Sequence, residues 1–176
     1  PVLAERKLKI VLDLAYGATS HVLPSVLAKL GADVLVVNPY AATAASATFD
    51  ADVHAANVAS LVKSSGADLG AVLSPDGERI VLVDDKANVL TGGQAQLVFV
   101  TMAAATGSGV IALPVDTPAE AALIAEKGGI DVIFTKRSAA SLLDEANRSH
   151  ALLAADRRGG VAFPSFLPAF DGVAAL

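Results

Sequence analysis

The stretch that decides the fold of this chain is a short acidic turn between two apolar runs. It reads Ala71-Val72-Leu73-Ser74-Pro75-Asp76-Gly77-Glu78-Arg79-Ile80-Val81-Leu82-Val83-Asp84-Asp85. Pro-Asp-Gly favours a turn because proline presets φ and glycine accepts a positive φ. The Val/Leu-rich runs on both sides favour strands. The stretch therefore predicts a β-hairpin with strands over 69–73 and 79–83.

The same turn carries three oxygen-bearing side chains at alternate positions. Ser74, Asp76 and Glu78 project to one side if the segment is extended, and oxygen ligands are those that Mg²⁺ prefers. Two interpretations therefore stay open. The three residues hold a magnesium ion, or the segment is an ordinary hairpin turn, which the spacing alone favours.

Strand-length apolar runs alternate with segments of helical period on both sides of this turn. Before it, the sequence predicts strands over 8–14 and 32–38, helices over 20–30 and 52–64, and a loop over 41–48. After it come helices over 91–105, 117–127 and 138–148, strands over 110–115, 130–135, 151–155 and 161–163, and a helix starting at Asp171. We expect an α/β fold with two similar mixed-sheet domains, 1–105 and 106–176, and helices on the sheet faces.

Capping residues support several of these helices. Gly66 stands just past the end of one helix, and Thr91 and Ser138 stand where an N-cap is needed. Pro118 is expected at the first position of its helix, and Pro24 within the first turn of the helix over 20–30. On that helix, the apolar side chains expected to share one face are Leu23, Val26, Leu27 and Leu30.

Composition narrows the class of protein. The chain has 176 residues, is 53% hydrophobic and carries a net charge of −5, which argues against nucleic acid or an anionic membrane as a partner. It lacks cysteine, which excludes disulfides and thiolate sites and fits a cytoplasmic protein. Apolar runs stay well short of the roughly 20 residues that span a bilayer. Pro1 stands in place of an initiator methionine, so we expect the chain to begin inside a longer parent.

Three further motifs precede the acidic turn in a recognisable order. They are Asp13-Leu14-Ala15-Tyr16-Gly17-Ala18, Leu30-Gly31-Ala32-Asp33-Val34 and Ala67-Asp68-Leu69-Gly70. They resemble Asp-x-x-Asn-Gly-Ala, Leu-Gly-Ala-x-Val and Ala-Asp-Leu-Gly of the second domain of the α-D-phosphohexomutases, the phosphomannomutase and phosphoglucomutase family. That family's metal loop, Asp-Gly-Asp-x-Asp-Arg, is similar to Ser74–Arg79, with Asp76 and Arg79 matching.

The resemblance implies a metal site at Ser74, Asp76 and Glu78, with Arg79 near the substrate. Two carboxylates in place of three weaken the attraction for a dication, and the extra methylene of Glu78 shifts its oxygens. We therefore expect Mg²⁺ to bind weakly or not at all.

The second half resembles the family's third domain, in shortened form. Asp171-Gly172-Val173-Ala174-Ala175-Leu176 is similar to its closing Asp-Gly-x-x-Ala-Leu. Its sugar-binding Gly-Glu-x-Ser-Gly-His corresponds to 155–160, where Gly159 matches and Asp156 is a shortened acid. The missing polar groups should weaken sugar recognition by roughly a few kcal/mol.

Several polar residues of the chain have two interpretations. Arg157 and Arg158 suit a phosphate beside glycine amides, so the predicted substrate-binding residues are Arg79, Asp156, Arg157, Arg158 and Gly159. The alternative is an exposed basic turn. The loop over 135–138 favours an anion or a plain N-cap. The histidines, which lack ligand spacing, are expected at the surface or at helix ends: His21, His54 and His150.

The family's catalytic phosphoserine and its main phosphate-binding loop belong to its first and fourth domains, and we find neither motif here. Phosphoryl transfer needs several groups positioned at once, so we expect no catalytic residue and no activity in isolation. Our first hypothesis is a degenerate phosphohexomutase-like region of a longer protein, such as the C-terminal part of a sugar-1-phosphate nucleotidyltransferase of the mannose-1-phosphate guanylyltransferase type. Its expected partners are a sugar phosphate and other domains of the parent, with oligomerisation left open. The alternatives are a fragment of an active magnesium-dependent mutase and a ligand-free interaction module.

Overall fold

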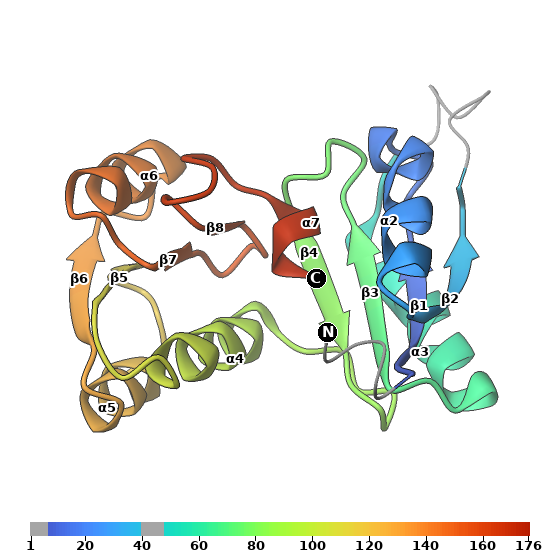
Figure 1. Cartoon of the computed structure of the whole chain (residues 1–176), viewed down its shortest axis with the longest axis horizontal. Helices are drawn as coiled ribbons and strands as arrows, with labels where there is room; N and C mark the ends of the chain where they lie inside the picture. The colour runs from blue at the N-terminus through green and yellow to red at the C-terminus, as the bar shows by residue number, and fades with distance from the viewer. Residues whose placement is uncertain (1–6, 40–47) are drawn as a thin grey trace. The chain divides into compact units, whose positions relative to one another are not determined.

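The computed structural model describes residues 7–39 and 48–176 and divides into two compact units that meet in the sequence at Leu90 and Thr91. Figure 1 shows both as sheets with helices packed on them. The predicted loop over 41–48 lies outside the described residues, apart from its last residue. The two α/β units confirm the predicted fold class.

The first unit is built on a four-stranded mixed sheet with the strand order β2-β1-β3-β4. The strands are β1 (Lys9–Asp13), β2 (Asp33–Val37), β3 (Leu69–Leu73) and β4 (Ile80–Val83). β1 runs parallel to β2 and to β3, whereas β3 and β4 are antiparallel, with Leu73 opposite Ile80. The predicted hairpin is therefore confirmed. The carboxyl ends of three parallel strands meet at one edge, which is where ligands bind in open α/β sheets.

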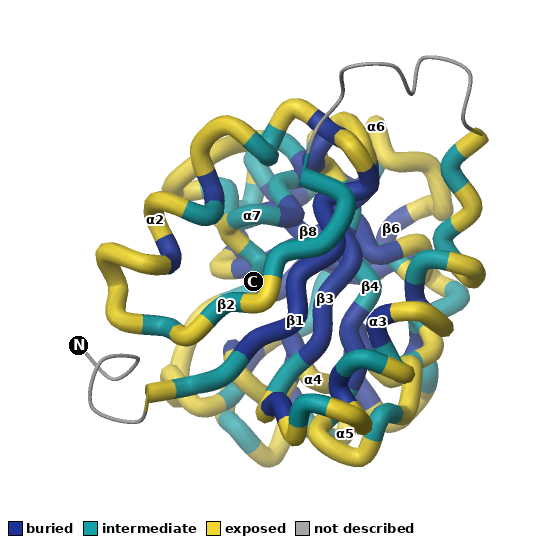
Figure 2. Tube along the Cα trace, turned by 90° about the vertical axis from the view of Figure 1, so that its right-hand side faces the viewer, coloured by how far each residue is buried: buried dark blue, intermediate teal, exposed yellow. Residues whose placement is uncertain are grey.

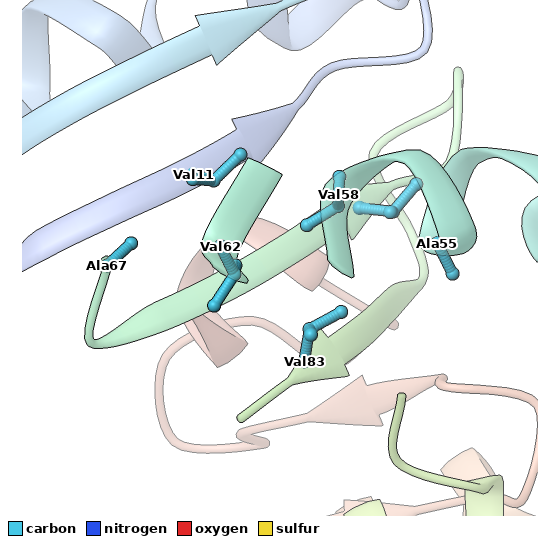
Figure 3. Close-up of a cluster of buried hydrophobic side chains, with 7 residues drawn as sticks. Val11, Ala55, Val58, Val62, Ala67 and Val83 are labelled. Carbon is cyan, nitrogen blue, oxygen red and sulfur yellow. The ribbon is translucent and has the colours of Figure 1, made fainter. Parts of the chain in front are cut away.

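The helix α3 (Ala51–Ser65) covers one face of this sheet and supplies much of its core. The Asp50 carboxylate caps it by accepting the N–H groups of Asp52 and Val53, and it ends at Gly66 in a left-handed conformation, as predicted. Valines of the helix and the strands pack together, as Figure 3 shows for Val11, Val58, Val62 and Val83. Burying such side chains contributes roughly 1.5–3 kcal/mol each.

The segment predicted as one helix over 20–30 is divided in two. A 3₁₀ turn, η1 (Ala18–His21), precedes α2 (Leu23–Lys29), because Pro24 restricts the α-helix to starting beside it. α2 buries Leu23 and Leu27, whereas Val26 and Leu30 are each 41% exposed. Only half of the predicted apolar face is therefore buried. α2 packs against β2, the edge strand, which Figure 2 shows to be more exposed than β1 and β3.

The second unit repeats the strand order, as β6-β5-β7-β8. Its strands are β5 (Val110–Pro114), β6 (Asp131–Thr135), β7 (Leu153–Ala155) and β8 (Val161–Ala162). β5 is parallel to β6 and to β7, and β7 pairs antiparallel with β8. Its helices are α4 (Gly92–Ala104), α5 (Glu120–Lys127), α6 (Ala139–Arg148) and α7 (Gly172–Ala175).

The helix starts of this unit test the capping predictions. Thr91 and Gln94 form a capping box, in which the Thr91 hydroxyl accepts the Gln94 N–H and the Gln94 side chain accepts the Thr91 N–H. Ser138 caps α6 by accepting the N–H of Ser141, so both predicted N-caps are confirmed. α5 begins later than predicted, at Glu120, and Pro118 lies before it. The chain first makes a turn in which the Thr117 N–H donates to Pro114. No helix within residues 7–39 and 48–176 is long and apolar enough to cross a membrane.

The position of the boundary between the units differs from the prediction near Thr106. The division falls after Leu90, because α4 packs against α5 and β7 of the second unit. Phe99 and Val100 of α4 are buried there. The alternation of strands and helices in the sequence did not show which sheet this helix covers.

Candidate functional site

The turn between β3 and β4 is closed by its own backbone. The Ser74 N–H donates to the Arg79 carbonyl at 3.0 Å, and the Gly77 N–H donates to the Ser74 carbonyl at 2.8 Å. The Ser74 hydroxyl oxygen accepts the Arg79 N–H at 3.0 Å. Gly77 has a φ of 78°, which glycine adopts without strain. The predicted ligand Ser74 is therefore a buried turn residue, since its side chain ties the two ends of the turn together.

The carboxylate of Asp76 is also tied to this turn. Its Oδ1 accepts a hydrogen bond from the Ser74 hydroxyl and another from the Glu78 N–H, the latter at 3.1 Å. The hydrogen bond from Ser74 is the main cause that lowers the pKa of Asp76. Burial opposes it by raising the pKa, and the Glu78 N–H and the Arg79 charge make smaller contributions that lower the pKa. Asp76 therefore stays ionised in the folded chain, at an exposed position beside exposed Glu78.

The acidic turn offers few ligands for a magnesium ion. Only two carboxylates, those of Asp76 and Glu78, lie in the turn, and the Ser74 proton is directed at Asp76. Within residues 7–39 and 48–176, no group of three or more His, Asp or Glu side chains is arranged to hold a metal ion. Two exposed carboxylates suit a largely hydrated Mg²⁺ ion. Weak or absent magnesium binding stays a prediction.

A loop at the end of β1 packs against this turn. The Ala18 N–H donates to the Pro75 carbonyl at 3.2 Å. Gly17 lies so close to the turn that a Cβ there would be 2.5 Å from the Pro75 carbonyl oxygen. The turn is thus held by a segment that lies far from it in sequence.

Sequence reasoning missed a buried polar cluster at the same edge of the sheet. His54 lies in the first turn of α3, but its Nδ1 is 2.7 Å from Oδ2 of fully buried Asp13. The Asn38 amide donates to both oxygens of the same carboxylate, at 3.1 and 3.0 Å. An aspartate at the end of a buried strand was the available signal, because a buried carboxylate needs partners. His21 and His150 are exposed, as predicted.

The second candidate turn joins β7 to β8 and contains four of the five predicted substrate-binding residues. The Asp156 N–H donates to the Gly160 carbonyl at 2.8 Å, and Asp156 Oδ1 accepts the N–H groups of Arg158 and Gly160 at 2.8 and 2.9 Å. Gly159 has a φ of 81°. Arg157 and Arg158 are exposed. Asp156 therefore organises the turn, and the two arginines are its accessible groups.

Arg157 and Arg137 both approach the same loop residue, Asp116. The Arg157 Nη1 donates to the Asp116 carbonyl at 3.5 Å, and the Arg137 Nε lies 3.5 Å from the Asp116 carboxylate. The remaining predicted substrate-binding residue, Arg79, belongs to the first unit. The structure thus brings Asp156, Arg157, Arg158 and Gly159 together in one turn of the second unit.

The comparisons with known proteins assign the family. A family model described as phosphoglucomutase/phosphomannomutase, alpha/beta/alpha domain II, matches residues 2–93, which is more than half of the chain. The chain therefore belongs to the phosphoglucomutase/phosphomannomutase family, as the motifs predicted. The match covers the first unit and ends within the first residues of α4.

Individual relatives extend this result. The phosphoglucosamine mutase of Shewanella denitrificans is 39% identical over 90 residues, which are 49% of this chain and 20% of that protein. The chain therefore spans about a fifth of the length of this relative. A solved phosphoglucomutase/phosphomannomutase family protein from Burkholderia thailandensis matches 96% of this chain and 38% of its own, with a TM-score of 0.84 and 17% identity.

A third similar protein is the Aspergillus fumigatus N-acetylphosphoglucosamine mutase, solved in complex with GlcNAc-6P and magnesium. It matches 89% of this chain and 36% of its own, with a TM-score of 0.60 and 18% identity. At this identity the likeness shows the fold of both units. Assignment of the second unit to the family's third domain stays a prediction.

Proposed function

We propose that this chain is a phosphohexomutase-like binding region that holds sugar phosphate and magnesium weakly and does not catalyse phosphoryl transfer in isolation. One observation carries the proposal. The turn Ser74–Arg79 offers two carboxylates, and one of them, Asp76, is hydrogen-bonded back to Ser74 and Glu78. A dication gains less attraction from such a turn than from three converging acids.

The second turn supports weak recognition of a phosphate group. Arg157 and Arg158 are exposed guanidinium groups, which suit phosphate oxygens. Asp156 uses Oδ1 to accept two backbone N–H groups, so this oxygen serves the turn. We therefore assign the phosphate, rather than the sugar hydroxyls, to this turn.

The parent protein that we propose is a sugar-1-phosphate nucleotidyltransferase of the mannose-1-phosphate guanylyltransferase type, a cytoplasmic protein in which this region contacts the other domains. A second candidate is a segment of a working phosphohexomutase, with Asp76 and Glu78 holding magnesium and Arg79 near the phosphoserine. The 39% identity to a phosphoglucosamine mutase favours this second candidate. The sequence of the parent gene distinguishes the two candidates. A nucleotidyltransferase parent encodes a nucleotidyltransferase signature, whereas a working phosphohexomutase encodes a phosphoserine loop.

The experiment is a calorimetric titration of the full chain with MgCl₂, compared with the double variant Ser74→Asp/Glu78→Asp. The variant restores three short acids at the positions that the resemblance assigns to the metal. We expect about tenfold tighter magnesium binding in the variant, equivalent to about 1.4 kcal/mol. The control, Ser141→Asp/Glu145→Asp on α6, makes the same substitutions away from the turn and should leave the affinity unchanged.

Two further outcomes would change the proposal. If the unchanged chain binds Mg²⁺ as tightly as the restored variant, the segment of a working mutase becomes the better description. Titration with mannose 1-phosphate should give weak binding that Arg157→Gln/Arg158→Gln abolishes. If no heat is detected even at the highest sugar-phosphate concentration, the binding function is wrong and a ligand-free interaction module remains.

A further inference from the structure

A buried acid with several hydrogen-bond partners lies at the end of β1, outside the acidic turn. Asp13 is fully buried. Its carboxylate accepts the Ala15 N–H at 2.8 Å and the Asn38 side chain at 3.1 and 3.0 Å, and His54 Nδ1 lies 2.7 Å from it. A buried carboxylate is strongly destabilising without such partners. Together these groups form the Asp13 cluster, defined as Asp13, Asn38 and His54.

The Asp13 cluster holds the loop Leu14–Ala18 in an unusual backbone conformation. Ala15 and Tyr16 have φ values of 44° and 58°, a region that residues with a Cβ seldom adopt. The bond from the Ala15 N–H to Asp13 holds the first of these residues. The Tyr16 N–H donates to the Asn38 carbonyl at 2.9 Å, which holds the second.

The same loop is in direct contact with the turn Ser74–Arg79. A Cβ on Gly17 would lie 2.5 Å from the Pro75 carbonyl oxygen and 2.7 Å from its Cα. The Ala18 N–H donates to that carbonyl at 3.2 Å. Further along, the Thr19 methyl group is 2.9 Å from the position that a Cβ would take on Gly77. The loop therefore contacts the turn at Pro75, and Thr19, the residue directly after the loop, lies beside Gly77.

We propose that Asp13, Asn38 and His54 are positioning residues that fix the acidic turn Ser74–Arg79 through the loop Leu14–Ala18. The cluster joins three elements at the carboxyl edge of one sheet, since Asp13 ends β1, Asn38 follows β2 and His54 comes from α3. The inference concerns the placement of Asp76 and Glu78, and it stands whether or not they bind a cation.

His54 is the member of the cluster that can be altered most cleanly. Its side chain is mostly buried, at 16% exposure, and the centroid of its ring lies 5.2 Å from the centroid of the Phe49 ring. With Nδ1 protonated, the ring donates to Asp13. His54→Asn retains a nitrogen donor at the corresponding branch of the side chain, whereas His54→Leu retains apolar bulk and removes the donor.

The test follows backbone amides of the full chain by ¹H–¹⁵N NMR. In His54→Leu we expect the amide resonances of Gly77, Glu78 and Arg79 to shift, together with those of Ala15 and Gly17. Hydrogen exchange of the Arg79 N–H should become about tenfold faster, because the turn that shelters it loosens. In His54→Asn, which keeps a donor, both the resonances and the exchange rate should stay close to those of the unchanged chain. His150→Leu, an exposed histidine changed in the same way, should leave them unaltered.

A purely structural role gives a different result. If His54→Leu lowers the thermal midpoint but leaves the amides of the acidic turn at their original positions, the proposal is wrong. If His54→Leu does not fold, Asn38→Gly decides, because it removes the side-chain donor and glycine accepts the φ of 51° found there. An unshifted turn in that variant overturns the inference, and a shifted turn supports it.

Discussion

The β3–β4 turn and the β7–β8 turn occupy the same place in two sheets of identical strand order. In each, the first residue after the strand accepts the N–H of the last turn residue with a side-chain oxygen. Ser74 does so for Arg79 at 3.0 Å, and Asp156 does so for Gly160 at 2.9 Å. Each turn also contains a glycine with a φ near 80°. The turn over 74–79 is one residue longer than the turn over 156–160. The comparison teaches that a hairpin turn at this place can be closed by the hydroxyl or the carboxylate of its first residue.

The two turns also share the way in which they are held against the rest of their unit. The second residue of each lies against a glycine from a distant segment, Pro75 against Gly17 and Arg157 against Gly92. The two turns differ in the charge that they expose. The first turn exposes Asp76 and Glu78, whereas the second exposes Arg157 and Arg158. The two turns are therefore held in a similar way, but they expose charges of opposite sign at different positions.

The largest effect should come from filling the space that the glycines leave. In Gly92→Ala the new methyl group would overlap the Arg157 carbonyl oxygen, and in Gly17→Ala it would lie 2.5 Å from that of Pro75. Since backbone must move, we expect losses in unfolding free energy of about 3 kcal/mol and about 2 kcal/mol respectively. Denaturant unfolding followed by circular dichroism measures both.

Gly66→Asn is the control for these two variants. Gly66 has a φ of 64° and no heavy atom within 4 Å of the added Cβ, and asparagine tolerates this conformation. We expect almost no change in unfolding free energy. If Gly92→Ala and Gly17→Ala are equally harmless, the glycines do not hold the turns and the likeness between the turns is superficial.

Removing the closing side chain should have an intermediate effect that differs between the turns. Asp156→Ala removes a charged acceptor of two N–H groups, and Ser74→Ala removes a neutral group that accepts one and donates to Asp76. We expect losses of about 2 and about 1 kcal/mol, because bonds to a charged group are stronger. Thermal unfolding of both variants compares them, and a larger loss in Ser74→Ala would contradict this order.

The smallest effect is a titration shift confined to the first turn. The Ser74 hydrogen bond holds the pKa of Asp76 below its usual value of about 3.8. Because the folded pKa is lowered, the ionised group stabilises the chain above the unfolded pKa, and this stabilisation is lost as pH falls through the folded pKa. Ser74→Ala should raise the pKa of Asp76 towards its ordinary value, as followed by carboxyl ¹³C NMR.

Asp84 provides an internal reference for this titration. Its pKa is also lowered, chiefly by the hydrogen bond from the Asn88 side chain, which lies outside the turn. We expect Ser74→Ala to leave the titration of Asp84 unchanged. A parallel shift of both aspartates would indicate a general change in the unit rather than the loss of one hydrogen bond.

Local signals in the sequence predicted the elements well. Pro75-Asp76-Gly77 between apolar runs predicted the hairpin, and Thr91 predicted the N-cap of α4, because both signals depend on neighbouring residues alone. The prediction that Pro118 occupies the first position of its helix was wrong, since proline also suits the turn that precedes the helix. The exposure of Val26 and the unit to which α4 belongs depend on which neighbours fold against them, so periodicity did not reveal either.

For the candidate sites, too, the sequence predicted the local features and the tertiary structure supplied the contacts between distant segments. The sequence by itself determined the family, the strand–helix rhythm of both units, and the two turns that carry their exposed charges, because motifs and turn chemistry are written in consecutive residues. Only the tertiary structure showed that Asp13 and His54, 41 residues apart, are hydrogen-bonded. It also showed that Gly17 and Gly92 give the turns room. Contacts between distant segments arise from packing, and packing is decided by the whole fold.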